Sequence, residues 1–132
     1  MPADIFLSDY DPGTNHHLVV ESDHCVVWAY LLTGDTQQIL MDGIVCSLIE
    51  PAEDWGEAID KTKPPPLLKR FANTYSVLPQ LREDQFRIQW TGHEVRVYID
   101  ETLYLVMDLH LRTSRSKALS LAGRYGLPLE DK

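Results

Sequence analysis

The segment RTSRSK, residues 112–117, combines three basic side chains with three hydroxyl groups. It precedes an apolar stripe at helical spacing and residues that commonly end a helix: Ala118, Leu121, Ala122 and Tyr125, then Gly126 and Pro128. Backbone amides at a helix N-terminus can donate to an anion. The segment is therefore a candidate anion site made of Arg112, Thr113, Ser114, Arg115, Ser116 and Lys117. The alternative, which is commoner in proteins, is a capped helix start with solvated bases.

Two adjacent histidines, His16 and His17, are the most evident candidates for metal ligands. They stand at the start of a predicted strand, where neighbouring side chains point to opposite faces, so the pair cannot chelate one ion. The chain has neither HxxxH nor CxxC spacing. The stretch from Asp9 begins like a calcium loop, but Thr14 replaces the required glycine and Val20 replaces the required glutamate. We therefore predict no metal site and no cofactor.

Motifs for nucleophilic catalysis and for phosphate-binding loops are absent from the sequence. Cys25 and Cys46 lie inside apolar runs, which make a thiol unreactive. We therefore expect a protein that is not an enzyme. A catalytic hypothesis would require a cleft that brings His16, His17, His24 or His93 to a carboxylate.

Charge is divided along the chain. The first 60 residues contain 12 acidic side chains and no lysine or arginine, whereas the remainder contains 8 acidic and all 12 basic side chains. This division predicts an acidic face that attracts a basic partner and raises its association rate. The alternative is that the acids are solvated in turns and on strand faces. The candidate partner-binding residues are Asp23, Asp35, Asp42, Glu53, Asp54, Trp55 and Glu57.

The composition is that of an ordinary globular protein. The 132 residues are 44% hydrophobic with a formal net charge of −8, which predicts a single domain over residues 1–132 and argues against nucleic acid as a partner. No apolar run reaches the roughly 18 residues of a membrane span, and the first residues lack the features of a signal peptide. We therefore expect a cytoplasmic protein without a membrane partner.

The elements that must position these residues follow from hydrophobic periodicity. Strand-like patterns cover residues 17–22, 25–33, 38–41, 44–49, 86–91, 94–99 and 103–111. Helical patterns cover 51–60, 67–78 and 113–125, the first two within a proline-rich middle. The sequence thus predicts an α+β fold. It would have a mainly antiparallel β-sheet or curled sandwich of about six strands, a partly helical crossover, and a C-terminal helix.

Two stretches, HHLVVESDHCVVWAYL and QWTGHEVRVYIDETLYLVMDL, carry a resemblance to a known family. An acidic turn before an aromatic strand, and a tryptophan-containing strand before a hairpin that ends in an apolar-Asp step, resemble a small bacterial family of uncharacterised proteins. The corresponding positions are Asp23, Trp28 and Tyr30, then Trp90 and Asp108. His24 stands where that family has a glycine. The resemblance implies a bacterial source and a similar fold, and it implies no activity.

The leading functional hypothesis is a non-catalytic cytoplasmic module that binds a basic protein partner through an acidic face. A small acidic inhibitor of that partner would be one example of such a module. The alternative is a domain that binds a small molecule or anion in a sheet pocket, with residues 112–117 as the anion clamp. A homodimer formed through exposed sheet edges is a further alternative.

Overall fold

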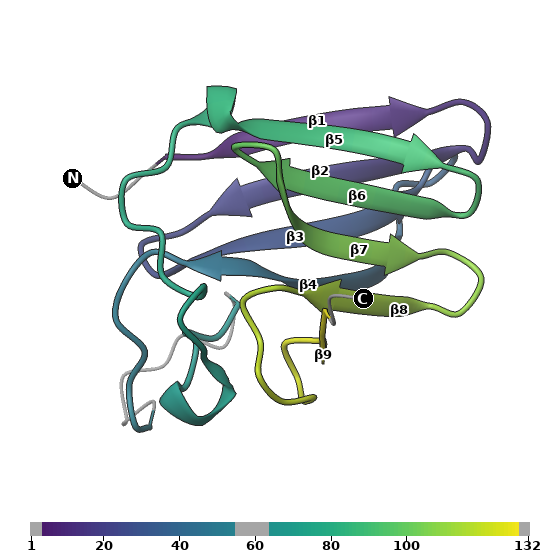
Figure 1. Ribbon diagram of the computed structural model, residues 1–132. Helices are drawn as coiled ribbons and strands as arrows, with labels where there is room; N and C mark the ends of the chain where they lie inside the picture. The colour runs from purple at the N-terminus through teal and green to yellow at the C-terminus, as the bar shows by residue number, and fades with distance from the viewer. Residues whose placement is uncertain (1–3, 55–63, 130–132) are drawn as a thin grey trace.

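Two β-sheets stacked face to face make up the protein (Figure 1). The computed structural model describes residues 4–54 and 64–129. The first sheet contains, in chain order, β1 (Phe6–Asp11), β2 (His16–Ser22), β3 (Val26–Thr33) and β4 (Ile39–Ser47). The second contains β5 (Phe86–Thr91), β6 (Glu94–Ile99), β7 (Thr102–Asp108), β8 (Thr113–Ser116) and β9 (Leu127–Pro128). Within each sheet, strands that follow one another in the chain pair antiparallel, except that β9 runs parallel to β8.

Alternation along the strands decides which side chains fill the space between the sheets. In β2, Leu18 and Val20 are fully buried, whereas their neighbours in the strand are partly exposed. In β6, Val95, Val97 and Ile99 are buried in the same alternating pattern. These residues belong to one core cluster contributed by both sheets. Each fully buried aliphatic side chain of this kind stabilises a fold by about 1.5–3 kcal/mol.

One edge of the sandwich joins β1 to β5. The indole Nε1–H of Trp90 donates to Asp9 Oδ2 at 2.8 Å, and the backbone N–H of Phe6 donates to Glu83 Oε2 at 2.8 Å. Glu83 opens the short 3₁₀ turn η2 (Glu83–Gln85) that leads into β5. Figure 1 shows β1 and β5 together along the upper edge. Polar side chains therefore hold the outermost strands of the two sheets in register.

The opposite edge joins β4 to β8. The hydroxyl of Ser116 donates to the carbonyl of Val45 at 3.3 Å. Gly43 lies so close to β8 that a Cβ atom at this position would collide with the Ser114 side chain. The chain therefore uses glycine here because the two backbones approach too closely for any larger residue.

A second cluster covers the outer face of the first sheet, beside β3 and β4. Trp28 and Ile44 pack there against Leu67, Leu119 and Tyr125, which come from segments outside the sheet. The Tyr125 hydroxyl donates to the carbonyl of Pro66 at 2.7 Å and accepts the backbone N–H of Leu68 at 3.1 Å. This tyrosine therefore fastens the proline-rich segment to the sheet. β3 is covered on both faces, as its continuous apolar run predicts.

The predicted α+β fold is wrong, because the described residues form strands and irregular segments with only two 3₁₀ turns as helical elements. They contain nine strands rather than the six expected. The C-terminal helix over 113–125 does not form. Thr113 and Ser114 pair instead with Asp108 and Met107 of β7. Hydroxyl side chains favour caps and strands over helix interiors, and here the sheet edge supplies hydrogen bonds that a helix would have to replace.

The middle of the chain is also less helical than expected. The helix predicted over 67–78 is reduced to the 3₁₀ turn η1 (Lys69–Phe71). Single β-bridges, Ala52 with Leu68 and Ser47 with Val77, hold this segment against the end of the first sheet. Most of the helix predicted over 51–60 lies outside the described residues, and residues 51–54 are not helical. None of the described helical turns has the length and apolar character needed to cross a membrane.

Candidate functional site

A hollow on the outer face of the first sheet brings together aromatic and acidic side chains. The strand register places Glu21 opposite Trp28, and Asp42 opposite Tyr30, so all four side chains belong to one face. Glu21, Asp23, Trp28 and Tyr30 border a space of about 220 Å³, which we call the acidic hollow. Among the described residues, no lysine or arginine lines it.

Hydrogen bonds fix the carboxylates around this hollow. The indole Nε1–H of Trp28 donates to Asp42 Oδ2 at 3.1 Å. Asp23 Oδ1 accepts the backbone N–H groups of Cys25 and Val26 at 2.6 and 2.8 Å, which closes the turn between β2 and β3. The donors to both carboxylates are neutral, so these hydrogen bonds bring no positive charge to the hollow.

The phenol of Tyr30 reports the electrostatic environment of the hollow. The pKa of Tyr30 is raised to about 12, first by burial and then by the nearby carboxylates of Glu21, Asp42 and Asp23 in that order. A phenolate would add a negative charge to a site that already holds three. The hollow therefore disfavours anions and favours cations.

Charge is segregated between the two sheets. Strands β1 to β4 contain no lysine or arginine, whereas β5, β6 and β8 each carry an arginine. Bases of the second part pair with acids of the same part: Arg82 with Asp84, Arg87 with Glu101, and Arg96 with Glu94. Lys69 and Glu53 form an ion pair between the two parts of the chain, at 3.4 Å. The carboxylates of the first sheet are therefore not neutralised by these arginines.

Large apolar side chains are exposed on the first sheet as well. Phe6 is 58% exposed and lies opposite Glu21, so it extends the face that carries the acidic hollow. Ile39 is 55% exposed and lies opposite Leu32 on the neighbouring strand. Exposed apolar groups beside charged groups are characteristic of surfaces that bind other proteins.

The predicted partner-binding residues are spread over several elements. Asp23 and Asp42 lie beside the acidic hollow, whereas Asp35 lies in the turn between β3 and β4 and accepts a hydrogen bond from Asn15 at 3.0 Å. Glu53 pairs with Lys69, and Asp54 lies exposed in the segment after β4. Trp55 and Glu57 lie outside the described residues. Glu21 and Tyr30 were missing from the prediction, although their place on the outward face of predicted strands was a usable signal.

The six residues of the predicted anion clamp do not converge on one point. Arg112 ends the turn between β7 and β8 with a φ of 56°, and Arg115 and Ser116 lie on opposite sides of β8. Lys117 lies over the ring of Tyr75, with its Nζ 4.0 Å from the centroid. Arg112, Thr113 and Ser114 line a groove of about 330 Å³ that also includes Arg124. The helix N-terminus invoked for this segment is absent, because residues 113–116 form a strand.

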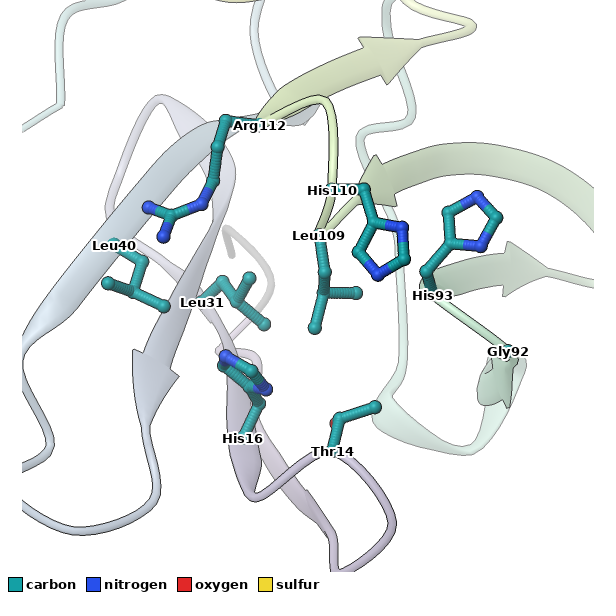
Figure 2. Close-up of a pocket in the computed structure, with 9 residues that line it drawn as sticks. All are labelled: Thr14, His16, Leu31, Leu40, Gly92, His93, Leu109, His110 and Arg112. Atoms are coloured by element: carbon teal, nitrogen blue, oxygen red, sulfur yellow. The ribbon is translucent and has the colours of Figure 1, made fainter.

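A larger cavity opens at the end of the sandwich where the β1–β2, β5–β6 and β7–β8 turns meet. It has a volume of about 480 Å³ and is lined by His16, His93, His110 and Arg112. Figure 2 shows Arg112 above and His16 below the apolar side chains, with the rings of His110 and His93 beside one another. The two rings stack with centroids 4.6 Å apart and planes 9° from parallel. We call this space the histidine cavity.

Apolar side chains form the rest of the histidine cavity. Leu31 and Leu40 come from the first sheet, and Leu109 comes from the turn after β7. The site therefore presents an apolar wall and a cluster of nitrogen-containing side chains, which is the usual composition of a small-ligand pocket. Arg112 was predicted from the sequence as an anion-binding residue, and His16 and His93 as histidines that a catalytic cleft would contain. His110 was not predicted, because no motif surrounds that residue.

Asp108 positions the turn that carries two of these side chains. Its Oδ1 accepts the backbone N–H groups of His110 and Leu111 at 2.9 and 2.8 Å, and its Oδ2 lies 3.4 Å from His93 Nε2. The hydrogen bonds from Leu111 and His110, together with the two nearby imidazoles, lower the pKa of the Asp108 carboxyl, while its desolvation raises it by less. Both oxygens are engaged, so this carboxylate acts as a structural element of the turn.

The described residues contain no group of three or more His, Cys, Asp or Glu side chains arranged to hold a metal ion. His17 stacks against Tyr10 on the outer face of the first sheet, and His24 is exposed in the β2–β3 turn. The carboxylate beside the cavity is that of Asp108, which lies 3.4 Å from His93 and already accepts the backbone N–H groups of its own turn.

The two cysteines lie on different sides of the first sheet: Cys46 belongs to the core between the sheets, whereas Cys25 packs against the outer cluster, and both are free thiols. Cys46 is fully buried, and burial raises the pKa of its thiol. Such a thiol is a poor nucleophile and serves as a small apolar core residue.

No protein-family model matches the chain, and no match is found among curated proteins or solved structures.

Proposed function

We propose that this protein is a non-catalytic module that binds a basic protein partner through the outer face of its first sheet. An arginine or lysine of the partner enters the acidic hollow beside Trp28 and Tyr30. The observation that carries the proposal is the composition of the hollow: carboxylates from Glu21 and Asp23 beside two aromatic rings, with Asp42 hydrogen-bonded to one of them.

The chemistry of the hollow suits a cationic side chain. Carboxylates form charge-assisted hydrogen bonds with guanidinium and ammonium groups. Tryptophan and tyrosine rings attract cations to their faces, by about 0.5–2 kcal/mol depending on desolvation. The pKa of Tyr30 is raised to about 12 by burial first, and the carboxylates of Glu21, Asp42 and Asp23 contribute to the same shift.

The remainder of the first sheet supports the same kind of partner. Its strands contain no lysine or arginine that would repel a basic surface. The exposed side chains of Phe6 and Ile39 add apolar contact area near the charged groups. A second copy of this chain would present the same acidic face, so repulsion between like charges opposes a homodimer formed through it. The proposed partner is therefore a different protein.

We place the module in the cytoplasm as part of this proposal. Cys25 and Cys46 are free thiols, which fits a reducing compartment.

The proposal is tested with a hexa-arginine peptide, followed by NMR at the Trp28 indole, with hexa-glutamate as the negative peptide. We expect binding of hexa-arginine at about 20 mM salt and a weakening of about tenfold or more at about 300 mM salt. The absence of a shift at Trp28 and Tyr30 at low salt would overturn the proposal.

A matched pair of double variants separates the hollow from net charge. Glu21→Gln with Asp42→Asn removes two charges at the hollow, and Glu50→Gln with Asp35→Asn removes two charges elsewhere in the first part of the chain. We expect the first pair to weaken binding of hexa-arginine by about tenfold and the second by less than about threefold. Equal losses would mean that only the overall charge attracts the peptide, and the assignment of the hollow would then be wrong.

A further inference from the structure

The histidine cavity lies at the opposite end of the first sheet from the acidic hollow and has the opposite chemical preference. His16 and Glu21 stand near the two ends of β2, and each belongs to one of the two sites. We propose that the histidine cavity binds a small organic oxyanion, a carboxylate or phosphate group on an apolar body. This proposal is independent of the protein-binding function, because no residue lines both sites.

Arg112 is the principal group for the oxyanion. It lines the cavity and forms no ion pair or side-chain hydrogen bond within residues 4–54 and 64–129. Arg82 and Arg87, which are also exposed, each pair with an acid instead. A guanidinium group presents paired donors that match the two oxygens of a carboxylate or phosphate.

The imidazoles supply further donors at the same place. His16 Nδ1 is buried and finds no hydrogen-bond partner within the described residues. His93 and His110 stack with ring centroids 4.6 Å apart, and both line the cavity. Each imidazole can donate a hydrogen bond to an oxyanion, and each gains attraction for it on protonation.

The turn that carries Arg112 and His110 is built rigidly. Asp108 Oδ1 accepts the N–H groups of His110 and Leu111, and Arg112 adopts a left-handed φ of 56°. A left-handed conformation is rare for a residue with a side chain, and here it sets the direction in which Arg112 leaves the backbone. The backbone positions from which these side chains extend are therefore fixed before a ligand arrives, which lowers the entropic cost of binding.

The apolar wall defines the rest of the ligand. Leu31, Leu40 and Leu109 line the cavity beside the basic groups, and the volume of about 480 Å³ exceeds what an inorganic ion fills. An oxyanion with a short hydrocarbon body satisfies both parts of the site. Inorganic phosphate satisfies only one of them.

The test uses four probes on the full chain: hexanoate, hexyl phosphate, hexanol and inorganic phosphate. Binding is followed by calorimetry and by the side-chain NMR signals of His16, His93 and His110. We expect at least one of the two organic anions to bind at least about tenfold more tightly than either hexanol or inorganic phosphate. The tighter of the two identifies the headgroup. Equal affinity for hexanol, or no shift at the three histidines with either organic anion, would overturn the proposal.

A matched arginine pair tests the role of Arg112. Arg112→Gln removes the guanidinium from the cavity, whereas Arg115→Gln makes the same change three positions along, at an exposed residue that does not line it. We expect the first variant to weaken binding of the organic anion by about tenfold or more and the second by less than about twofold. Both positions are exposed, so neither variant depends on refolding of the core. Equal losses would overturn the assignment of Arg112.

Discussion

The indole nitrogen of Trp90 lies 2.8 Å from a carboxylate oxygen of Asp9, a residue 81 positions away in the chain. Trp90 belongs to β5 and Asp9 to β1, so this hydrogen bond crosses between the two sheets at their shared edge. Its donor is neutral and its acceptor is charged, which makes it stronger than an ordinary side-chain hydrogen bond. Its exposure to solvent reduces that advantage.

The first prediction concerns this bond. Trp90→Phe and Asp9→Ala, measured singly and together by urea denaturation, should give a coupling free energy of about 1 kcal/mol. The coupling arises because each substitution removes the same hydrogen bond. A coupling indistinguishable from zero would show that the edge is held by apolar packing alone.

The second prediction concerns the close approach of β4 and β8. Gly43→Ala should lower the free energy of unfolding by about 1–3 kcal/mol, because the new Cβ collides with the Ser114 side chain. Adding Ser114→Ala should recover part of the loss by removing the Ser114 hydroxyl. Gly13→Ala is the control, since a Cβ there meets only an ordinary contact 3.5 Å away, and we expect a change within about 0.5 kcal/mol. Equal effects at the two glycines would contradict the packing described.

The third prediction concerns Tyr125. Tyr125→Phe removes the hydroxyl that accepts the Leu68 N–H and donates to the Pro66 carbonyl, so we expect a loss of about 1–3 kcal/mol in denaturant unfolding. Tyr98→Phe removes a hydroxyl that bonds to Gln89 at 3.1 Å in a more exposed position, and it should cost less than about 1 kcal/mol. If Tyr98→Phe proved the more damaging of the two, the tyrosine would not be what fastens the proline-rich segment.

The fourth prediction concerns pH. The phenol of Tyr30 has a pKa of about 12 in the folded state, against about 10 for an unfolded chain. The stability that this group contributes is present below pH 10 and is lost as the pH rises from about 10 to about 12, because only the unfolded state ionises in that range. NMR of labelled tyrosines should show Tyr30 titrating near the top of this range.

A variant of the acidic hollow provides the control for this titration. Glu21→Gln with Asp42→Asn should lower the pKa of Tyr30 without returning it to its ordinary value, because burial makes the largest contribution and remains. An unchanged titration in the double variant would show that the carboxylates do not act on this phenol.

The strands were predictable because alternation is a local property. The patterns over 86–91 and 94–99 coincide with β5 and β6. The C-terminal helix was predicted from four apolar residues at helical spacing, but in the fold Ala118 and Tyr125 are buried while Leu121 and Ala122 are exposed. The stripe therefore packs on no single surface. Pairing with β7 decided the structure of 113–116, and no local pattern could reveal that partner.

The two sites were predictable to different degrees. Asp23 and Asp42 were recognised from the charge pattern, but only the strand register places Glu21, Trp28 and Tyr30 beside them. The histidine cavity could not be predicted from the sequence, because its residues come from turns separated by tens of positions in the chain. No sequence motif marks His110 as a functional residue. Its role becomes evident only in the fold, where its ring stacks on that of His93.

Each sheet is built from one continuous stretch of chain, β1 to β4 before the proline-rich middle and β5 to β9 after it. Every hairpin can therefore close with a partner nearby in the sequence, and the two meanders need to meet only once. The first stretch is acidic and the second is basic, so long-range attraction favours that encounter. The molecule is thus organised as a pair of complementary halves, suited to being cut in the middle and reassembled from its two fragments.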